Sequence, residues 1–119
     1  MSYVDGFLLA MSADGIDDYR KLAELACTVW KDHGALDYKE CLIDDDAPDG
    51  LRSFRDAANA SEGEAIIFAF ITYRSREHRD EVNEKVMADS RMSGMSMDSV
   101  PFETKRMAFG GFKTIVEWD

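Results

Sequence analysis

Asp5 is the residue that most clearly could do chemistry, because it interrupts an otherwise apolar segment over residues 3–11. Side chains alternate along a strand, so Asp5 shares a face with Tyr3, Phe7 and Leu9. We expect this face to be buried. Burial raises the pKa of a carboxyl group unless a cation or hydrogen-bond donors pair with it. Asp5 is therefore a candidate general base.

The sequence leaves a structural role for Asp5 open as well. Its carboxylate could form an ion pair with Arg106 or Lys113, or accept hydrogen bonds from nearby backbone N–H groups. The pattern does not fix which face of the last strand points inward. The roles of both basic residues therefore stay open.

His33 is the second catalytic candidate and one of only two histidines in the chain. An imidazole near the core could act as a general acid or base, or bind a ligand at the rim of a cavity. It could equally be the last residue of a helix, stabilised by the helix dipole. Trp30, one turn earlier, is either part of the core or a platform for a ligand. The other histidine, His78, lies among charged residues and is expected to be solvated.

Few residues in the sequence could hold a metal ion. Cys27 and Cys41 are isolated, which favours reduced and largely buried thiols over a disulfide or a zinc site. The acidic run over residues 44–46 lacks the glycine and glutamate spacing of an EF-hand. No phosphate-binding glycine loop, nucleophile elbow or HExxH motif is present. We therefore predict no metal site and no cofactor, and the pattern does not support dedicated hydrolase chemistry.

The charge balance restricts the partners that we expect. Asp and Glu number 24 against 14 Lys and Arg, which gives a net charge of −10. Such a surface repels phosphate backbones and anionic membranes. The sequence has no run of 18 apolar residues and no basic N-terminal stretch followed by an apolar one. We therefore expect a cytoplasmic protein that binds neither nucleic acid nor membranes.

Two segments with helical periodicity and four with strand character must position these side chains. Apolar residues three or four apart predict a helix that begins at Ile16 and ends at His33 and the following glycine. Ser75 is expected to cap a second helix, with Val86 and Met87 facing inward. Strands are predicted over residues 3–11, 35–43, 64–73 and 105–118.

Two connecting segments lack strand character. Residues 44–63 form a long excursion, in which Ser53 could cap a short helix. We interpret this excursion as a lid or an interface element. Residues 90–103 are irregular, and their methionines either pack on the domain edge or form an adaptable apolar surface. These methionines are Met92, Met95 and Met97.

The order of the elements predicts an α+β fold of the ferredoxin-like type. This fold is β-α-β-β-α-β, with a four-stranded antiparallel sheet and both helices on one face. All 119 residues are expected to form a single domain, 1–119. The strands are apolar on both sides, so the uncovered face needs a cover, and a second subunit is the natural one. We therefore predict a homodimer.

A family resemblance is carried by four stretches of the chain: YVDGF (residues 3–7), WKDHGALDY (30–38), RDEVNEKVM (79–87) and KRMAFGGF (105–112). Together they resemble the YbaA-like family of small bacterial proteins of unknown function. Departures are small: the family has Pro at Ser90 and Trp at Phe70. The resemblance implies a dimeric α/β barrel in which two ferredoxin-like sheets face each other, and we expect the row that contains Asp5 to line its interior. It also implies kinship with cofactor-independent monooxygenases, haem-degrading enzymes and stress-response barrels, without supplying an activity.

Two functions follow as alternatives. The first is an uncharacterised small protein that binds an apolar or aromatic molecule in the dimer barrel. The second is a cofactor-independent, monooxygenase-like or related enzyme in which Asp5 or His33 is the base. The residues expected to form the ligand site are Tyr3, Phe7, Trp30, Phe68, Phe70, Arg106 and Phe109.

Overall fold

The computed structural model describes residues 1–93 and 100–118. Its elements, in chain order, are β1 (Tyr3–Ser12), η1 (Ala13–Gly15), α1 (Ile16–Asp32), β2 (Asp37–Leu42), α2 (Phe54–Ala57), β3 (Glu64–Tyr73), α3 (Arg76–Ala88), η3 (Thr104–Arg106) and β4 (Ala108–Lys113).

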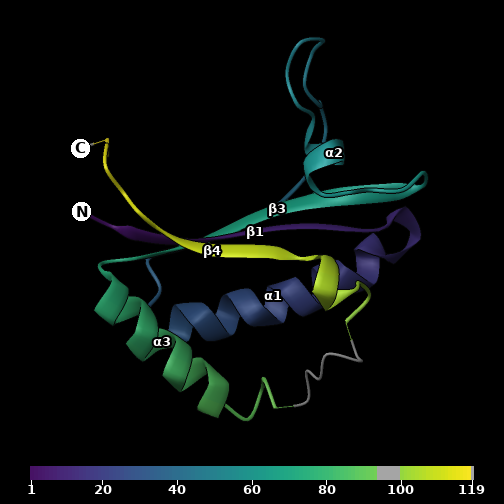
Figure 1. Cartoon of the computed structure of the whole chain (residues 1–119). Coiled ribbons are helices and arrows are strands. Elements are labelled where there is room, and N and C mark those ends of the chain that lie inside the picture. The colour runs from purple at the N-terminus through teal and green to yellow at the C-terminus, as the bar shows by residue number, and fades with distance from the viewer. Residues whose placement is uncertain (94–99, 119) are drawn as a thin grey trace.

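The four strands form one antiparallel sheet in the order β2-β3-β1-β4, so the fold is α+β. Figure 1 shows α1 and α3 on one side of this sheet and α2 on the other. We call the side that faces α1 and α3 the helix face, and the opposite side the open face.

The two longest strands, β1 and β3, lie at the centre of the sheet. They pair over their whole length, from Tyr3 opposite Tyr73 to Ser12 opposite Glu64. Long apolar runs suit this position, because a central strand is covered on both sides. The shorter β2 and β4 form the edges.

Helix α1 begins and ends where the sequence predicts, and α3 begins where the sequence predicts. His33 follows the last residue of α1, and Gly34 then adopts a φ of +107°, a conformation that favours glycine. Ser75 precedes α3, and its Oγ accepts a hydrogen bond from the backbone N–H of His78 at 3.0 Å. These ends fix how far each helix extends beneath the sheet.

The helix face holds most of the core. One cluster joins both helices to β3 through Val29, Tyr73, Val82 and Val86, none more than 1% exposed. A second cluster lies around Leu9, on β1 near the start of α1. The open face buries only a small cluster beneath α2, formed by Ala10, Ala58 and Ile66.

The last strand is shorter than the predicted span of residues 105–118. Its first part forms η3 instead, and pairing then ends at Lys113, which lies opposite Tyr3. The physical reason is that β1 starts at Tyr3, so a longer β4 would have no neighbour. Only one backbone bond continues, from Thr114 N to Ser2 O at 3.2 Å. The tail beyond it is exposed.

Three expectations about burial were wrong. His78 is only 6% exposed, because its Nδ1 accepts a hydrogen bond from the backbone N–H of Arg74 and its ring meets Tyr73 edge-on. Met87 is 68% exposed, since it lies one residue beyond the buried stripe of α3. Cys41 is also exposed, on the edge strand β2.

The excursion over residues 44–63 contains the expected short helix. Ser53 caps α2 by accepting a hydrogen bond from the backbone N–H of Asp56. Asp46 accepts bonds from the backbone N–H groups of Ala47 and Phe54, which holds the loop against the start of this helix. The excursion is therefore internally bonded, and it projects on the open face (Figure 1).

Candidate ligand pocket

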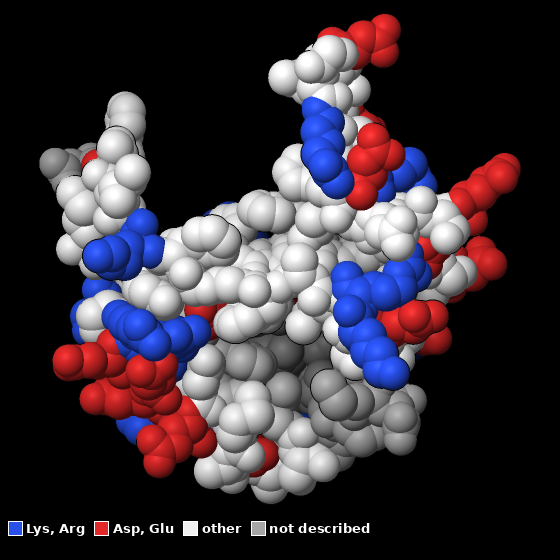
Figure 2. All heavy atoms as spheres, in the orientation of Figure 1, with Lys and Arg blue, Asp and Glu red and all other residues white. Residues whose placement is uncertain are grey.

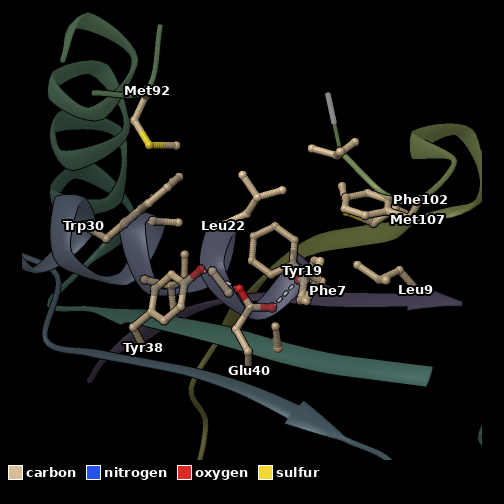
Figure 3. Close-up of a pocket in the computed structure, with 15 residues that line it drawn as sticks. Phe7, Leu9, Tyr19, Leu22, Trp30, Tyr38, Glu40, Met92, Phe102 and Met107 are labelled. Atoms are coloured by element: carbon tan, nitrogen blue, oxygen red, sulfur yellow. Dashed lines mark hydrogen bonds between the residues drawn. The ribbon is translucent and has the colours of Figure 1, made fainter. Parts of the chain in front are cut away.

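A pocket lies between α1 and the helix face of the sheet. It is a partly open hollow, and the space in it that no atom fills, open solvent at its mouth included, is about 680 Å³. Figure 3 shows side chains converging on it from helix, sheet and the segment before β4. The fifteen lining residues are Phe7, Leu9, Tyr19, Leu22, Ala23, Ala26, Trp30, Tyr38, Glu40, Ala69, Ile71, Met92, Val100, Phe102 and Met107.

The walls follow from the apolar stripe of α1 and the alternation of the strands. Tyr19, Leu22, Ala23, Ala26 and Trp30 recur every three or four residues, so they face the sheet along one side of the helix. The two alanines leave space that longer side chains would fill. The pocket is therefore the gap that small residues leave in the helix–sheet contact.

Among the described residues, Glu40 is the only acidic one that lines the pocket. Its side chain rises from β2 between two phenol groups (Figure 3). Tyr38 Oη donates a hydrogen bond to Glu40 Oε2 at 2.6 Å, and Tyr19 Oη donates one to Oε1. Burial, and then the charge of Glu40, raises the pKa of each tyrosine well above its usual value. Both phenols therefore remain protonated and act as donors.

Trp30 is held in place by polar contacts at its outer edge. Its Nε1–H lies 3.0 Å from Tyr73 Oη and 3.1 Å from Asn83 Oδ1, and donates to both. The ring centre lies 6.2 Å from that of Tyr38, on the side of the pocket. The indole thus presents its apolar surface to the cavity while its polar group is satisfied elsewhere.

Asp5 lies on the helix face but outside the pocket lining. It is 1% exposed, and Arg79 Nη1 of α3 donates a hydrogen bond to its Oδ1 at 2.8 Å. Burial raises the pKa of Asp5, and the charge of Arg79 opposes that shift. The expectation that Asp5 pairs with Arg106 or Lys113 was wrong. Its expected position in the interior of a barrel was also wrong, because the row of β1 that contains Asp5 packs against the helices. Its catalytic role stays a prediction.

His33 also lies outside the pocket lining. Its Nε2 is 2.8 Å from Asp89 Oδ2, and Arg91 donates hydrogen bonds to both oxygens of the same carboxylate. These bonds, those from Arg91 first, lower the pKa of Asp89 below its usual range. Arg91 also bonds Asp32 at 2.8 Å. The cluster ties the end of α1 to the end of α3, and the catalytic role of His33 stays a prediction.

The seven residues expected to form a ligand site do not converge on one place. Phe7 and Trp30 line the pocket, whereas Phe68 and Phe109 line a shallow hollow at β1 and β4. Phe7 bridges the two, with its ring centre 5.0 Å from that of Phe109. The remaining three are placed elsewhere: Tyr3 beneath the Arg79 guanidinium, Phe70 beneath Lys39, and Arg106 bonded to Glu64 and the Asn59 carbonyl.

The hydrogen-bonded group of Glu40, Tyr19 and Tyr38 in the pocket was not predicted from the sequence. Tyr19 belongs to the predicted stripe of α1, and Glu40 shares the alternating row of Leu36, Tyr38 and Leu42. An acidic residue within that row is the same signal that singled out Asp5. Applied to β2, it would have indicated Glu40.

Within residues 1–93 and 100–118, no group of three or more His, Cys, Asp or Glu side chains is placed to hold a metal ion. In the same part of the chain, no helix has the length and apolar character needed to cross a bilayer. Of the methionines in the irregular segment, Met92 lines the pocket, and Met95 and Met97 fall outside the described residues.

Fold and pocket together define a small α+β protein with an apolar cavity between its helices and a four-stranded antiparallel sheet. Residues 2–104 match the model of a protein family of unknown function, DUF1428, and the chain belongs to that family. It is 45% identical over 118 residues to the uncharacterized protein YbaA of Escherichia coli K12, covering 98% of this chain and 99% of that protein. The uncharacterized YbaA proteins of Escherichia coli O157:H7 and Shigella flexneri match equally.

Among solved structures, the de novo designed protein Foldit4 aligns with 98% of this chain and 100% of its own. The TM-score is 0.43 and the identity is 8%.

Proposed function

We propose that this protein binds a small apolar or aromatic molecule in the pocket between α1 and the sheet. The observation that carries the proposal is an open cavity in which apolar side chains surround one carboxylate. Ligand sites of this kind combine apolar walls with a few polar groups that fix orientation. Met92 and Met107 add flexible walls that can adapt to a ligand's shape.

Calorimetric titration with 2-phenylethanol, a neutral aromatic probe, tests this proposal. We expect saturable binding to the unmodified protein, and its loss in Ala23→Phe, which fills the cavity from α1. Leu25→Phe is the matched control, because Leu25 lies on the same helix outside the pocket lining. Absence of binding to the unmodified protein, or equal binding by Ala23→Phe, would contradict the proposal.

We further propose that the chain forms one ferredoxin-like domain over residues 1–119 and that two copies pair in the cytoplasm as a dimeric α/β barrel. The strand order β2-β3-β1-β4 with α1 and α3 on one face supports the ferredoxin-like assignment. In that arrangement the open faces of the two sheets turn toward each other, while each ligand pocket stays within its own subunit.

The open face supports a second copy as its cover. Three phenylalanines there remain about half exposed: Phe54 at 48%, Phe68 at 45% and Phe112 at 60%. The ring of Phe112 packs over Gly6 and Gly110, where a side chain on either glycine would crowd it. Such a cluster is unfavourable in a monomer.

The shape and charge of this side also suit a copy of the same chain. Figure 2 shows uncharged residues between two projections, with the charged side chains gathered toward the flanks. One projection is the excursion that carries α2, and the other is the C-terminal segment (Figure 1). Both carry exposed apolar side chains, Leu51 on the first and Ile115 and Trp118 on the second. Because the centre of this side is uncharged, two acidic copies can meet there without placing carboxylates opposite one another.

A further inference from the structure

We infer that the pocket selects ligands that carry a positively charged group, such as small apolar or aromatic amines, with the ammonium at Glu40. This inference rests on the proposed ligand-binding function and names the ligand class for the same site.

The carboxylate of Glu40 can accept more hydrogen bonds than the two phenols donate to it. A carboxylate offers roughly four acceptor positions. The two phenols occupy one on each oxygen. The remaining positions lie at a carboxylate that forms part of the pocket wall. An ammonium supplies N–H donors that fit them.

Within the described part of the chain, no cation balances the negative charge of Glu40. Among the ion pairs of the described residues, Glu40 has no Lys, Arg or His partner. None of the fifteen described residues that line the cavity is basic either. A half-buried carboxylate in apolar surroundings is costly unless it is paired. Asp5 on the same face is paired with Arg79, so Glu40 differs from it in this respect. A ligand cation would supply the charge that the chain does not.

Aromatic side chains line the pocket around the carboxylate of Glu40. Tyr19, Trp30 and Tyr38 border the same cavity, and their rings attract a cation at their faces. A ligand that carries a carboxylate or phosphate meets the opposite situation, because Glu40 repels it and none of the described lining residues is a cation that offsets that repulsion. The pocket is therefore selective by charge as well as by shape.

The test compares three probes that share one phenyl ring: 2-phenylethylamine, 2-phenylethanol and phenylacetate, titrated calorimetrically at pH 7. We expect the amine to bind about 10- to 100-fold more tightly than the alcohol, the range for a hydrogen bond to a charged group. Phenylacetate should bind least. In Glu40→Gln, the advantage of the amine over the alcohol should disappear, while the affinity for the alcohol stays within about threefold.

Glu24→Gln is the matched control, because it removes one negative charge from an exposed position of α1. It should leave the preference for the amine unchanged. If the alcohol binds in the pocket and the amine binds no more tightly, this inference is wrong and the proposed function stands. If neither probe binds, both are wrong. Should Glu40→Gln not fold, the comparison of the probes on the unmodified protein decides alone.

Discussion

The two faces of the sheet are both rich in apolar side chains, yet they are covered in different ways. The helix face lies under α1 and α3, and its side chains form two continuous core clusters. The open face has only α2 and its loop above it, and three phenylalanines stay about half exposed there. An apolar strand pattern therefore predicts that a strand is buried, but it does not predict which part of the protein covers it.

The helix face also carries the two acidic residues that interrupt apolar rows. Asp5 is matched by the guanidinium of Arg79, whereas Glu40 is matched only by two phenols. The first arrangement is complete within the chain and points to a structural role. The second leaves a charge without a counter-charge at the wall of a cavity, and this is where we place the ligand.

The largest expected effect comes from breaking the ion pair of the helix face. Asp5→Ala leaves Arg79 without its buried partner, and we expect the free energy of unfolding to fall by about 3 kcal/mol. Asp80→Ala is the control, because Asp80 bonds Nε of the same arginine but its side chain is 62% exposed. It should cost less than about 1 kcal/mol. Urea denaturation measures both, and equal losses would show that burial does not distinguish the two pairs.

The open face should respond through association instead of stability. Phe68→Glu places a charge at the centre of the exposed phenylalanines, and we expect the dimer dissociation constant to rise about 30-fold or more. Met87→Glu, which alters an exposed apolar residue on α3, should leave it unchanged. Sedimentation velocity at micromolar concentration gives the measurement. If the unmodified protein sediments only as a monomer, the proposed dimeric barrel is wrong.

The same variant tests whether ligand binding on the helix face depends on the open face. Because the pocket lies within one subunit, Phe68→Glu should still bind 2-phenylethanol with little change in affinity. Loss of ligand binding together with the dimer would mean that the site depends on the second copy.

A smaller effect is expected at the end of the sheet, where Arg106 joins Glu64 of β3 to the Asn59 carbonyl beyond α2. Hydrogen bonds from Arg106 lower the pKa of Glu64 from 4.5 to about 2. A folded-state pKa below the unfolded value stabilises the protein above the unfolded pKa, and this contribution is lost as the pH falls from 4.5 toward 2.

Replacing the cation should therefore change the acid limb of the stability curve. In Arg106→Met, the free energy of unfolding should fall less steeply than in the unmodified protein between pH 4.5 and 2. Urea denaturation at several pH values provides the curve, with Lys105→Met, its exposed neighbour, as control. Identical acid limbs would show that the pair contributes nothing to folding.

Local patterns predicted the elements well, since helices and central strands carry their own periodicity. The bounds of the predicted strand over residues 64–73 coincide with β3, and the capping roles of Ser53 and Ser75 are confirmed. The end of β4 could not be read from its own residues, because it depends on where β1 begins.

The site was harder to predict, because it is a property of contacts between distant segments. Asp5 was recognised as unusual, but its partner comes from a helix 74 residues away. The pocket brings Tyr19 of α1 to Glu40 of β2, and neither residue reveals the other in the sequence. The sequence therefore indicated that Asp5 is chemically unusual, but it did not indicate which residues lie beside it.

The proposal that a small molecule binds in the pocket on the helix face can be tested by locating the bound molecule. Methyl-detected NMR during titration with 2-phenylethanol can resolve both faces of the sheet at once. We predict shifts at Leu22, Ala23 and Met107, which line the pocket, and none at Leu8 or Ala108, which line the hollow at β1 and β4. Shifts confined to Leu8 and Ala108, or no shifts at saturating probe, would contradict the account.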